Sequence, residues 1–338
     1  MDWSQPAARL AAEEVALIAR AVFQAPDDAP VLFTAGGTES VLLAMLAARG
    51  ARPRGGGGSI VAGESAHPCL AKAAHLLGLQ LVSVPIDSDG RTPAAMLEQA
   101  IRADTIAVVA SMPTDCHGVC DDVQAIGRMA ERRGVWLHLD ACLGGWLLPF
   151  MRHAGHDVPA PDFRLPGVCS ISADLHKYGY APIGISTLLF RTPDLAAGAR
   201  FQWDAWPGPV HVSDRLAGTR SIDTLAGAWA TLVVLGATGM TARASAIVEN
   251  MRNFAVMIEA LPGVRLLSRP EAGLVHFGAA DGSASFGPAL AARGMRGNVT
   301  RRPAGFIVCI GPERGADDLD RWQTEIAAAL GVVCAPKG

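Results

Sequence analysis

Lys177 is the residue whose type and position most directly indicate chemistry. It lies in the segment SISADLHKYGYAPIG (170–184), after an apolar run and before a loop interrupted by glycine and proline. Rigid surroundings that exclude water disfavour the ammonium form of a lysine, and the neutral amine is a nucleophile toward a carbonyl. We therefore expect Lys177 to be a desolvated amine that attacks an aldehyde.

A glycine-rich turn at 34–40, with the sequence TAGGTES, precedes a helical pattern that ends at Gly50. Glycines let a ligand approach the backbone closely, and the free N–H groups of a first helical turn bind anions, here with the hydroxyls of Thr38 and Ser40. The turn matches neither a nucleotide-binding P-loop nor the dinucleotide fingerprint. An ordinary helix cap is the alternative interpretation, and the segment alone favours neither.

His67 and Asp140 follow two of the predicted strands. Pro68 suits the first turn of a helix, which places His67 in the loop just ahead of that helix. Asp140 ends the run VWLHLD (135–140), and its apolar neighbours predict a largely buried carboxylate. A buried carboxylate needs a cationic or N–H partner, and a cofactor nitrogen would supply one.

Alternating strands and helices predict an α/β fold with a parallel sheet. The run Thr105–Ser111 is nearly continuous in β-branched and apolar residues, as in a strand buried on both faces. The carboxyl ends of such strands gather ligand groups at one edge, so the 34–40 turn, His67, Asp140 and Lys177 should meet there. Together they fit pyridoxal 5′-phosphate: the turn binds the phosphate, His67 stacks on the ring, Asp140 pairs with the ring nitrogen and Lys177 forms a Schiff base.

The chain also resembles a known family, the fold-type I pyridoxal-phosphate enzymes of the group II decarboxylase superfamily, and within it the sphingosine-1-phosphate lyase branch. The matching segments are TAGGTES (34–40), SAHPCLAKAA (65–74), HLDACLGGWLLPFM (138–151), SISADLHKYGYAP (170–182), and DAWPGPV with AGTRS between 204 and 221. The resemblance implies an aspartate aminotransferase-like large domain with a mostly parallel seven-stranded sheet, followed by a small α+β C-terminal domain.

The expected domain organisation has four parts. These are an N-terminal helix over 1–25, a cofactor-binding large domain over 26–222, linking helices over 223–262 and a small domain over 263–338. We expect residues 201–220 to form a loop. The long helical stretch that follows should break near Gly236.

Further cofactor contacts follow from the resemblance. The phosphate contacts that it implies within the subunit are Gly37, Thr38 and His176. Ala141 should pack on the ring face opposite His67. Gly218 and Thr219 match a segment that in this family reaches the phosphate from the neighbouring subunit, which implies a homodimer with shared active sites.

Three departures from the family pattern concern the substrate. Lyases of this branch usually carry a lysine where this chain has Ile183, and that lysine helps to hold the substrate phosphate. The loop after the 105–111 strand reads PTDCHG in place of an aromatic–proline pattern, which brings His117 toward the pocket. The chain also begins late relative to the family's N-terminal segment, which helps to build the active-site wall. We therefore expect the cofactor, but not a sphingoid phosphate as substrate.

The leading functional hypothesis is a carbon–carbon lyase that takes an amine or amino acid as an external aldimine and releases an aldehyde by retro-aldol cleavage. An amino-acid decarboxylase or another amino-acid-transforming enzyme is the alternative, since one cofactor serves both reactions. Arg301 and Arg302 could clamp a substrate carboxylate, although solvated surface arginines are commoner, and Lys177 or His117 could transfer protons. A decayed non-catalytic subunit is a third hypothesis. The catalytic residues would be Lys177, Asp140 and His67.

Composition and charge argue against several other classes. Half of the residues are hydrophobic, 18% are charged and the net charge is −3, so a sizeable core is expected and a nucleic-acid surface is not. The seven cysteines show no disulfide spacing, and Cys116, His117 and Cys120 have no second pair, so we expect no metal site. The sequence also lacks a signal-peptide pattern and an uninterrupted apolar span. We expect a cytoplasmic protein without a membrane span.

Overall fold

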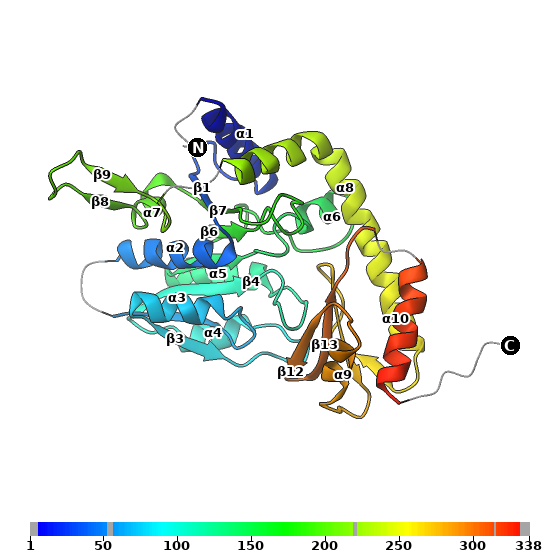
Figure 1. The fold of residues 1–338 in the computed structure, drawn as a ribbon. Helices are drawn as coiled ribbons and strands as arrows, with labels where there is room; N and C mark the ends of the chain where they lie inside the picture. The colour runs from blue at the N-terminus through cyan, green and yellow to red at the C-terminus, as the bar shows by residue number, and fades with distance from the viewer. Residues whose placement is uncertain (1–5, 53–56, 219–221, 314–315, 332–338) are drawn as a thin grey trace.

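The computed structural model describes residues 6–52, 57–218, 222–313 and 316–331 of the 338-residue chain (Figure 1). A seven-stranded sheet with the strand order β1-β7-β6-β5-β4-β2-β3 forms its larger part. Only β7 is antiparallel to its neighbours, which confirms the mostly parallel sheet expected from the sequence. The strands are β1 (Val31–Thr34), β2 (Ser59–Gly63), β3 (Gln80–Val84), β4 (Thr105–Ser111), β5 (Trp136–Asp140), β6 (Val168–Ala173) and β7 (Ser186–Phe190).

Helices cover both faces of this sheet, which explains the continuous apolar run of β4. Every residue of β4 is buried, and its side chains alternate between two core clusters, with Val108 and Ala110 in one and Ala107 and Val109 in the other. The helices on one face are α2 (Gly37–Gly50), α3 (Cys69–Leu77) and α7 (Pro193–Ala197). Those on the other face are α1 (Pro6–Val22), α4 (Ala94–Ala100), α5 (Val123–Arg133), α6 (Leu148–His153) and part of α8 (Asp223–Ala260).

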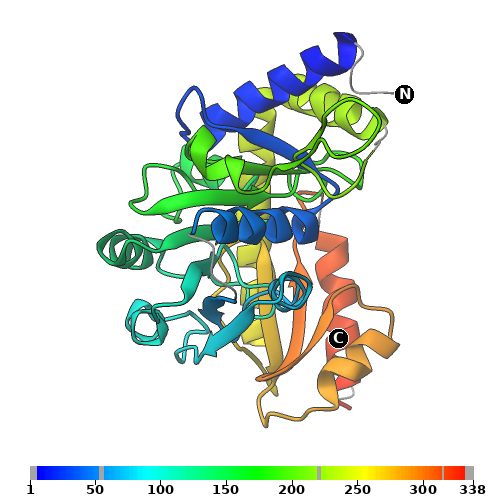
Figure 2. The same ribbon diagram turned by 90° about the vertical axis from the view of Figure 1, so that its left-hand side faces the viewer.

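A second, four-stranded antiparallel sheet with the order β10-β11-β13-β12 follows in the chain and lies beside the large sheet (Figure 2). Its strands are β10 (Val264–Leu266), β11 (Leu274–Ala279), β12 (Asn298–Arg301) and β13 (Ala304–Cys309), and its helices are α9 (Phe286–Ala292) and α10 (Ala316–Ala329). The aromatic rings of Phe254, Phe277 and Trp322 pack in its core. The sequence interpretation missed β12, because three of its four residues are exposed and its apolar pattern is weak.

Helix α8 runs past both sheets, and Gly236 interrupts it with a φ of 56° and a ψ of −174°, at the expected break. By length and composition alone α8 could cross a membrane, since an 18-residue window has a mean hydropathy of 1.5 and is 22% buried. However, α8 packs on α1, α6 and the small sheet, and core helices of soluble proteins can also meet these criteria. The absence of a membrane span therefore stays a prediction.

The expected loop over 201–220 is wrong in part. Residues Phe201–Trp203 (β8) and His211–Ser213 (β9) pair as an antiparallel hairpin that projects from the body of the protein (Figure 1). Its tryptophan and proline content suggested a loop, but the hairpin alternates apolar side chains. Trp203 is 51% exposed and Trp206 is 49% exposed, so the hairpin presents apolar surface outward.

Tyr178 connects the large sheet to the small one. It follows β6, is buried, and its hydroxyl lies 3.2 Å from the carbonyl oxygen of Gly273 and 3.0 Å from that of Ile310. The hydroxyl of nearby Tyr180, by contrast, has no hydrogen-bond partner among the described residues.

We predict that Tyr178→Phe lowers the free energy of unfolding by about 1–2 kcal/mol, because it removes the hydroxyl that donates to the buried carbonyl oxygen of Ile310. Tyr180→Phe is the matched control and should change stability by less than about 0.5 kcal/mol. Urea unfolding of both variants measures the difference. Equal stabilities of the two variants would contradict the role assigned to the Tyr178 hydroxyl.

Candidate active site

A cavity of about 540 Å³ lies at the carboxyl edge of the large sheet. Its walls come from the turn after β1, the start of α3, the ends of β4 and β5, and the loop after β6. The structure brings together here six residues that the sequence singled out. They are Gly37, Thr38, His67, Asp140, His176 and Lys177.

The start of α2 forms one end of this cavity. Helix α2 begins at Gly37, with Gly36 as its N-cap, and the first N–H groups of a helix have no acceptor within it. Gly37 and Thr38 line the cavity, so these donors and the positive end of the helix dipole can bind an anion there. His176 lines the same wall, and its Nδ1 accepts a hydrogen bond of 3.2 Å from the amide of Ile185, which fixes the ring.

Gly37 is required by close packing at this point. A Cβ atom at Gly37 would lie 2.5 Å from the Sγ of Cys142 and 3.1 Å from Oδ2 of Asp174. The glycine therefore lets the helix terminus approach the loop that carries Lys177. Ser40 does not serve the anion site as expected, because its buried hydroxyl lies 2.6 Å from that of Thr34.

His67 and Asp140 lie on two other walls of the cavity. Nδ1 of His67 accepts a hydrogen bond of 3.1 Å from the amide of Cys69, which holds the ring at the start of α3. Asp140 is half-buried at the end of β5, and its Oδ1 accepts from the amide of Cys142 at 3.2 Å and from the hydroxyl of Ser172 at 3.4 Å. One edge of its carboxylate is therefore fixed by the protein.

Lys177 is held by an ion pair, which corrects the expectation of a neutral amine. Its Nζ lies 3.0 Å from Oδ2 of Asp174, a residue that is 3% exposed. Burial lowers the pKa of Lys177, but the Asp174 carboxylate, with smaller contributions from Cys142 and Asp140, outweighs burial and raises this pKa above its usual value. The sequence argument counted desolvation and missed the carboxylate three residues earlier.

Asp174 and Cys142 are the site residues that sequence reasoning missed. Oδ1 of Asp174 is buried without a hydrogen-bond partner among the described residues, and Asp174 lines the cavity. Cys142 also lines it, whereas Ala141, expected on the ring face, is fully buried in the core of the sheet. Position 142 and not 141 therefore faces the cavity, because adjacent residues after a strand point to opposite sides. The i, i+3 spacing of Asp174 and Lys177 was the available signal.

His117, proposed as a proton-transfer residue, lies in the contact between the two sheets. Its ring packs edge-on against His276 with centroids 5.6 Å apart, its Nδ1 lies 3.1 Å from the Sγ of Cys116, and burial lowers its pKa. It does not line the cavity in the described part of the chain. The described residues hold no group of three or more His, Cys, Asp or Glu side chains placed to bind a metal.

The remaining candidates also lie away from this cavity in the described structure. Arg301 and Arg302 are exposed at the end of β12, and Ile183 is 88% exposed. Gly218 is exposed and does not line the cavity, although Leu216, two residues earlier, does. Thr219 lies outside the described residues.

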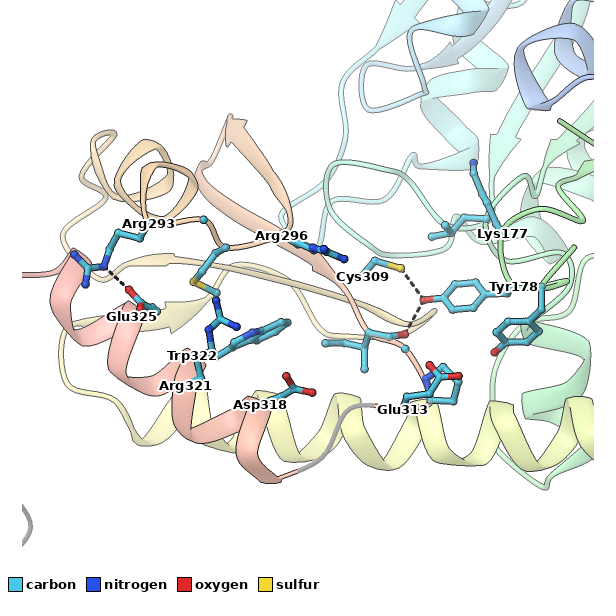
Figure 3. Close-up of a pocket in the computed structure, with 17 residues that line it drawn as sticks. Lys177, Tyr178, Arg293, Arg296, Cys309, Glu313, Asp318, Arg321, Trp322 and Glu325 are labelled. Carbon is cyan, nitrogen blue, oxygen red and sulfur yellow. Dashed lines mark hydrogen bonds and ion pairs between the residues drawn. The ribbon is translucent and has the colours of Figure 1, made fainter. Parts of the chain in front are cut away.

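A second cavity, of about 860 Å³, lies between Lys177 and the small sheet. Figure 3 shows Tyr178 and Lys177 at one end and the ion pair of Arg293 with Glu325 at the other. Lys177 borders both cavities, but its Nζ points away from this one, toward Asp174. Arg296 lies between these two ends of the second cavity (Figure 3).

The residues of the first cavity fit pyridoxal 5′-phosphate. Gly37 lets the first turn of α2 pack closely against Cys142 and Asp174, so the free N–H groups of that turn border the cavity and suit a phosphate. Asp174 presents an unpartnered carboxylate oxygen beside the amine of Lys177. Asp140 presents a second carboxylate on another wall, with one edge already fixed. The helix terminus suits the phosphate of the cofactor, the amine of Lys177 suits its aldehyde, and the carboxylate of Asp140 suits its ring nitrogen.

Comparisons with known proteins support the same cofactor. Residues 15–280 match the pyridoxal-dependent decarboxylase conserved domain. The chain is 34% identical over 286 residues to the sphingosine-1-phosphate lyase of Arabidopsis thaliana, and 36% over 279 residues to that of Saccharomyces cerevisiae. These matches cover 82% and 80% of this chain but 52% and 47% of the relatives, so the chain spans about half the length of the curated relatives it matches.

Solved structures of other proteins share the fold of this chain. A sphingosine-1-phosphate lyase of Burkholderia pseudomallei superimposes with a TM-score of 0.88 at 33% identity, over 96% of this chain and 77% of that one. Glutamate decarboxylase of Lactobacillus brevis has a TM-score of 0.82 at 19% identity, over 96% of this chain and 80% of that one, which shows the shared fold alone.

We predict that Asp174→Asn lowers the pKa of Lys177, because it removes the negative charge that favours the ammonium form. The chain has only three lysines, at 72, 177 and 337, so ¹³C-methylation of the amines gives an NMR spectrum that is simple to assign. A pH titration should show the Lys177 signal titrating at lower pH in Asp174→Asn. Asp115→Asn, an exposed acid at the cavity wall, is the control. An unchanged Lys177 titration would refute the ion pair.

Proposed function

This chain belongs to the pyridoxal-dependent decarboxylase family, and we propose that it is a carbon–carbon lyase that releases an aldehyde from a β-hydroxy amine. The observation that carries the proposal is the position of Lys177 between Asp174 and the cavity that Gly37 and Asp140 line. The matched relatives named sphingosine-1-phosphate lyase support this reaction class.

Each side chain that lines the cavity would serve a different part of the cofactor or the substrate. When bound, pyridoxal 5′-phosphate supplies an aldehyde and a ring that withdraws electrons from the substrate. The first turn of α2 and His176 would bind its phosphate, and Asp140 would hold the proton on the ring nitrogen. His67, in the loop just ahead of α3, would stack on the cofactor ring. Lys177 supplies the amine, and Asp174 holds the proton at Nζ until the amine is needed.

Retro-aldol cleavage is favoured over an amino-acid reaction by the cations that line the cavity. Among the described residues, its charged nitrogen groups are Lys72 and Lys177, with no arginine to clamp a carboxylate. The arginines proposed for that role, Arg301 and Arg302, are exposed elsewhere. Ile183 offers no charge for a substrate phosphate, so we propose an amine substrate that does not depend on a phosphate group.

An amino-acid decarboxylase is the second candidate, and one observation favours it. Arg296 lines the second cavity, which Lys177 also borders, and it has no ion-pair partner in the described part of the chain. If the substrate carries a carboxylate, Arg296 is the better-placed partner than the arginines at the end of β12.

We also propose that two copies of the chain associate through the β8–β9 hairpin. Phe201 and Trp203 lie exposed on one face of the hairpin, and Val212 is exposed on the other, so the hairpin presents apolar side chains to solvent. The segment then leads to Leu216, which lines the cavity, so a second copy on this surface would close the site. The chain's family resemblance to homodimers with shared sites supports this arrangement.

A substrate panel tests the proposed reaction. β-Hydroxy amines without phosphate should release aldehyde, their phosphate esters should react at least about tenfold more slowly, and amino acids should release little carbon dioxide. Lys177→Ala should lose at least about a thousandfold in turnover. Full turnover in Lys177→Ala would refute the assignment. Efficient cleavage of sphingosine 1-phosphate would refute the substrate argument from Ile183.

The association proposal has a separate test. Replacing Trp203 and Trp206 by serine should convert a dimer to a monomer in analytical ultracentrifugation and weaken cofactor binding. Val256→Ser, which changes an exposed apolar residue on α8 that lines neither cavity, would serve as a control for loss of surface hydrophobicity. A wild-type protein that sediments as a monomer with full cofactor affinity would exclude the shared site.

A further inference from the structure

Trp136, His138, Asp140, Ser170 and Ser172 form a continuous row of hydrogen-bonding side chains across β5 and β6. The parallel register sets His138 opposite Ser170 and Asp140 opposite Ser172. Trp136, His138 and Asp140 share one face of β5 because side chains alternate along a strand. His138, Ser170 and Ser172 are fully buried, and the row ends at the carboxylate that faces the cofactor cavity.

The distances connect these five side chains into one chain of hydrogen bonds. Nε1 of Trp136 lies 3.0 Å from Oγ of Ser170, which lies 2.8 Å from Nδ1 of His138. Nε2 of His138 lies 3.2 Å from Oγ of Ser172, and this oxygen lies 3.4 Å from Oδ1 of Asp140. The weak donor Cys142 also reaches Ser172, at 3.2 Å.

The chemistry of the two ends fixes the direction of every proton between them. An indole N–H can only donate, so Ser170 accepts from Trp136, and its own proton is available to Nδ1 of His138. An ionised carboxylate can only accept, so the hydroxyl of Ser172 donates to Asp140 and accepts from His138. The Ser172 end requires a proton on Nε2 of His138, and in a neutral ring Nδ1 then accepts from the hydroxyl of Ser170. Burial lowers the pKa of His138 to about 4, which keeps the ring neutral at physiological pH.

We propose that Trp136, Ser170, His138 and Ser172 act as a directed hydrogen-bond relay that positions Asp140 for the ring nitrogen of the cofactor. The relay delivers one oriented O–H to Oδ1, and the amide of Cys142 holds the same oxygen at 3.2 Å. Because the amide of Cys142 and the hydroxyl of Ser172 both fix Oδ1, the other oxygen, Oδ2, is left to bind a ligand in the cavity. Hydrogen bonds in a buried chain strengthen one another. The four residues together therefore stabilise the orientation of Asp140 more than Ser172 would alone.

The first test compares cofactor binding in Ser172→Ala and Ser59→Ala. Ser59 is an equally buried serine of the same sheet, on β2 and away from the cavity. Cofactor-free proteins are titrated with pyridoxal 5′-phosphate and with its 1-deaza analogue, which has no ring nitrogen. Ser172→Ala should weaken pyridoxal 5′-phosphate binding about tenfold and leave binding of the analogue within about twofold of wild type, while Ser59→Ala changes neither.

An equal loss for both ligands would show a general structural defect and overturn the proposal. No loss for either ligand would overturn it too. The proposal rests on the cofactor assignment, so the wild type is examined first by borohydride reduction and mass analysis of Lys177. Failure to label Lys177 would refute that assignment, an outcome distinct from a wild type that binds cofactor while Ser172→Ala shows no preference.

His138 gives a second, independent test. Gln has a donor and an acceptor that can replace the Nε2 proton and Nδ1, so His138→Gln should retain affinity for pyridoxal 5′-phosphate within about threefold, whereas His138→Leu should lose about tenfold. Imidazole ¹⁵N NMR of the wild type should show the Nε2-protonated tautomer. An Nδ1-protonated ring would reverse the required donor order and overturn the relay.

Discussion

The pairing of β5 with β6 is the constraint on which the rest of the site depends. This register sets Asp140 beside Ser172 and sends the chain from Ala173 into the loop that carries Asp174 and Lys177. A slip of one residue would turn His138 and Asp140 to the opposite face of the sheet, because side chains alternate with a period of two. The buried apolar clusters on both faces prevent such a slip, so core packing fixes the position of the catalytic groups.

A second constraint is the balance of charge at Lys177. Removing either an ammonium or a carboxylate group from water without a partner is unfavourable. Asp174 and Lys177 compensate each other, while one oxygen of Asp174 keeps no partner among the described residues. The cavity therefore presents an unpartnered oxygen of Asp174 and the ammonium group of Lys177 to a ligand. The first can accept hydrogen bonds from the ligand, and the second can bind its anionic groups. That arrangement is suited to a cofactor that carries both a phosphate and an aldehyde.

The sequence predicted the fold well where local and tertiary preferences agree. The continuous run Thr105–Ser111 became the interior strand β4, buried on both faces, and the break expected near Gly236 interrupts α8. The prediction from sequence failed for elements whose structure depends on tertiary contacts. Strand β12 has exposed polar residues and exists because β13 pairs with it, and the hairpin in 201–220 lies in a segment whose prolines and tryptophans suggested a loop.

By itself, the sequence determined which chemical groups follow the strands: a glycine turn, His67, Asp140 and Lys177. Strand order along the chain and the edge rule for parallel sheets sufficed for that, since both depend on local pattern. Only the tertiary structure decided how these groups are charged and aimed. It turned Cys142 and not Ala141 to the cavity, paired Lys177 with Asp174, and moved His117 into the contact between the sheets. Burial, distance and facing direction are properties of packed neighbours, and linear spacing does not contain them.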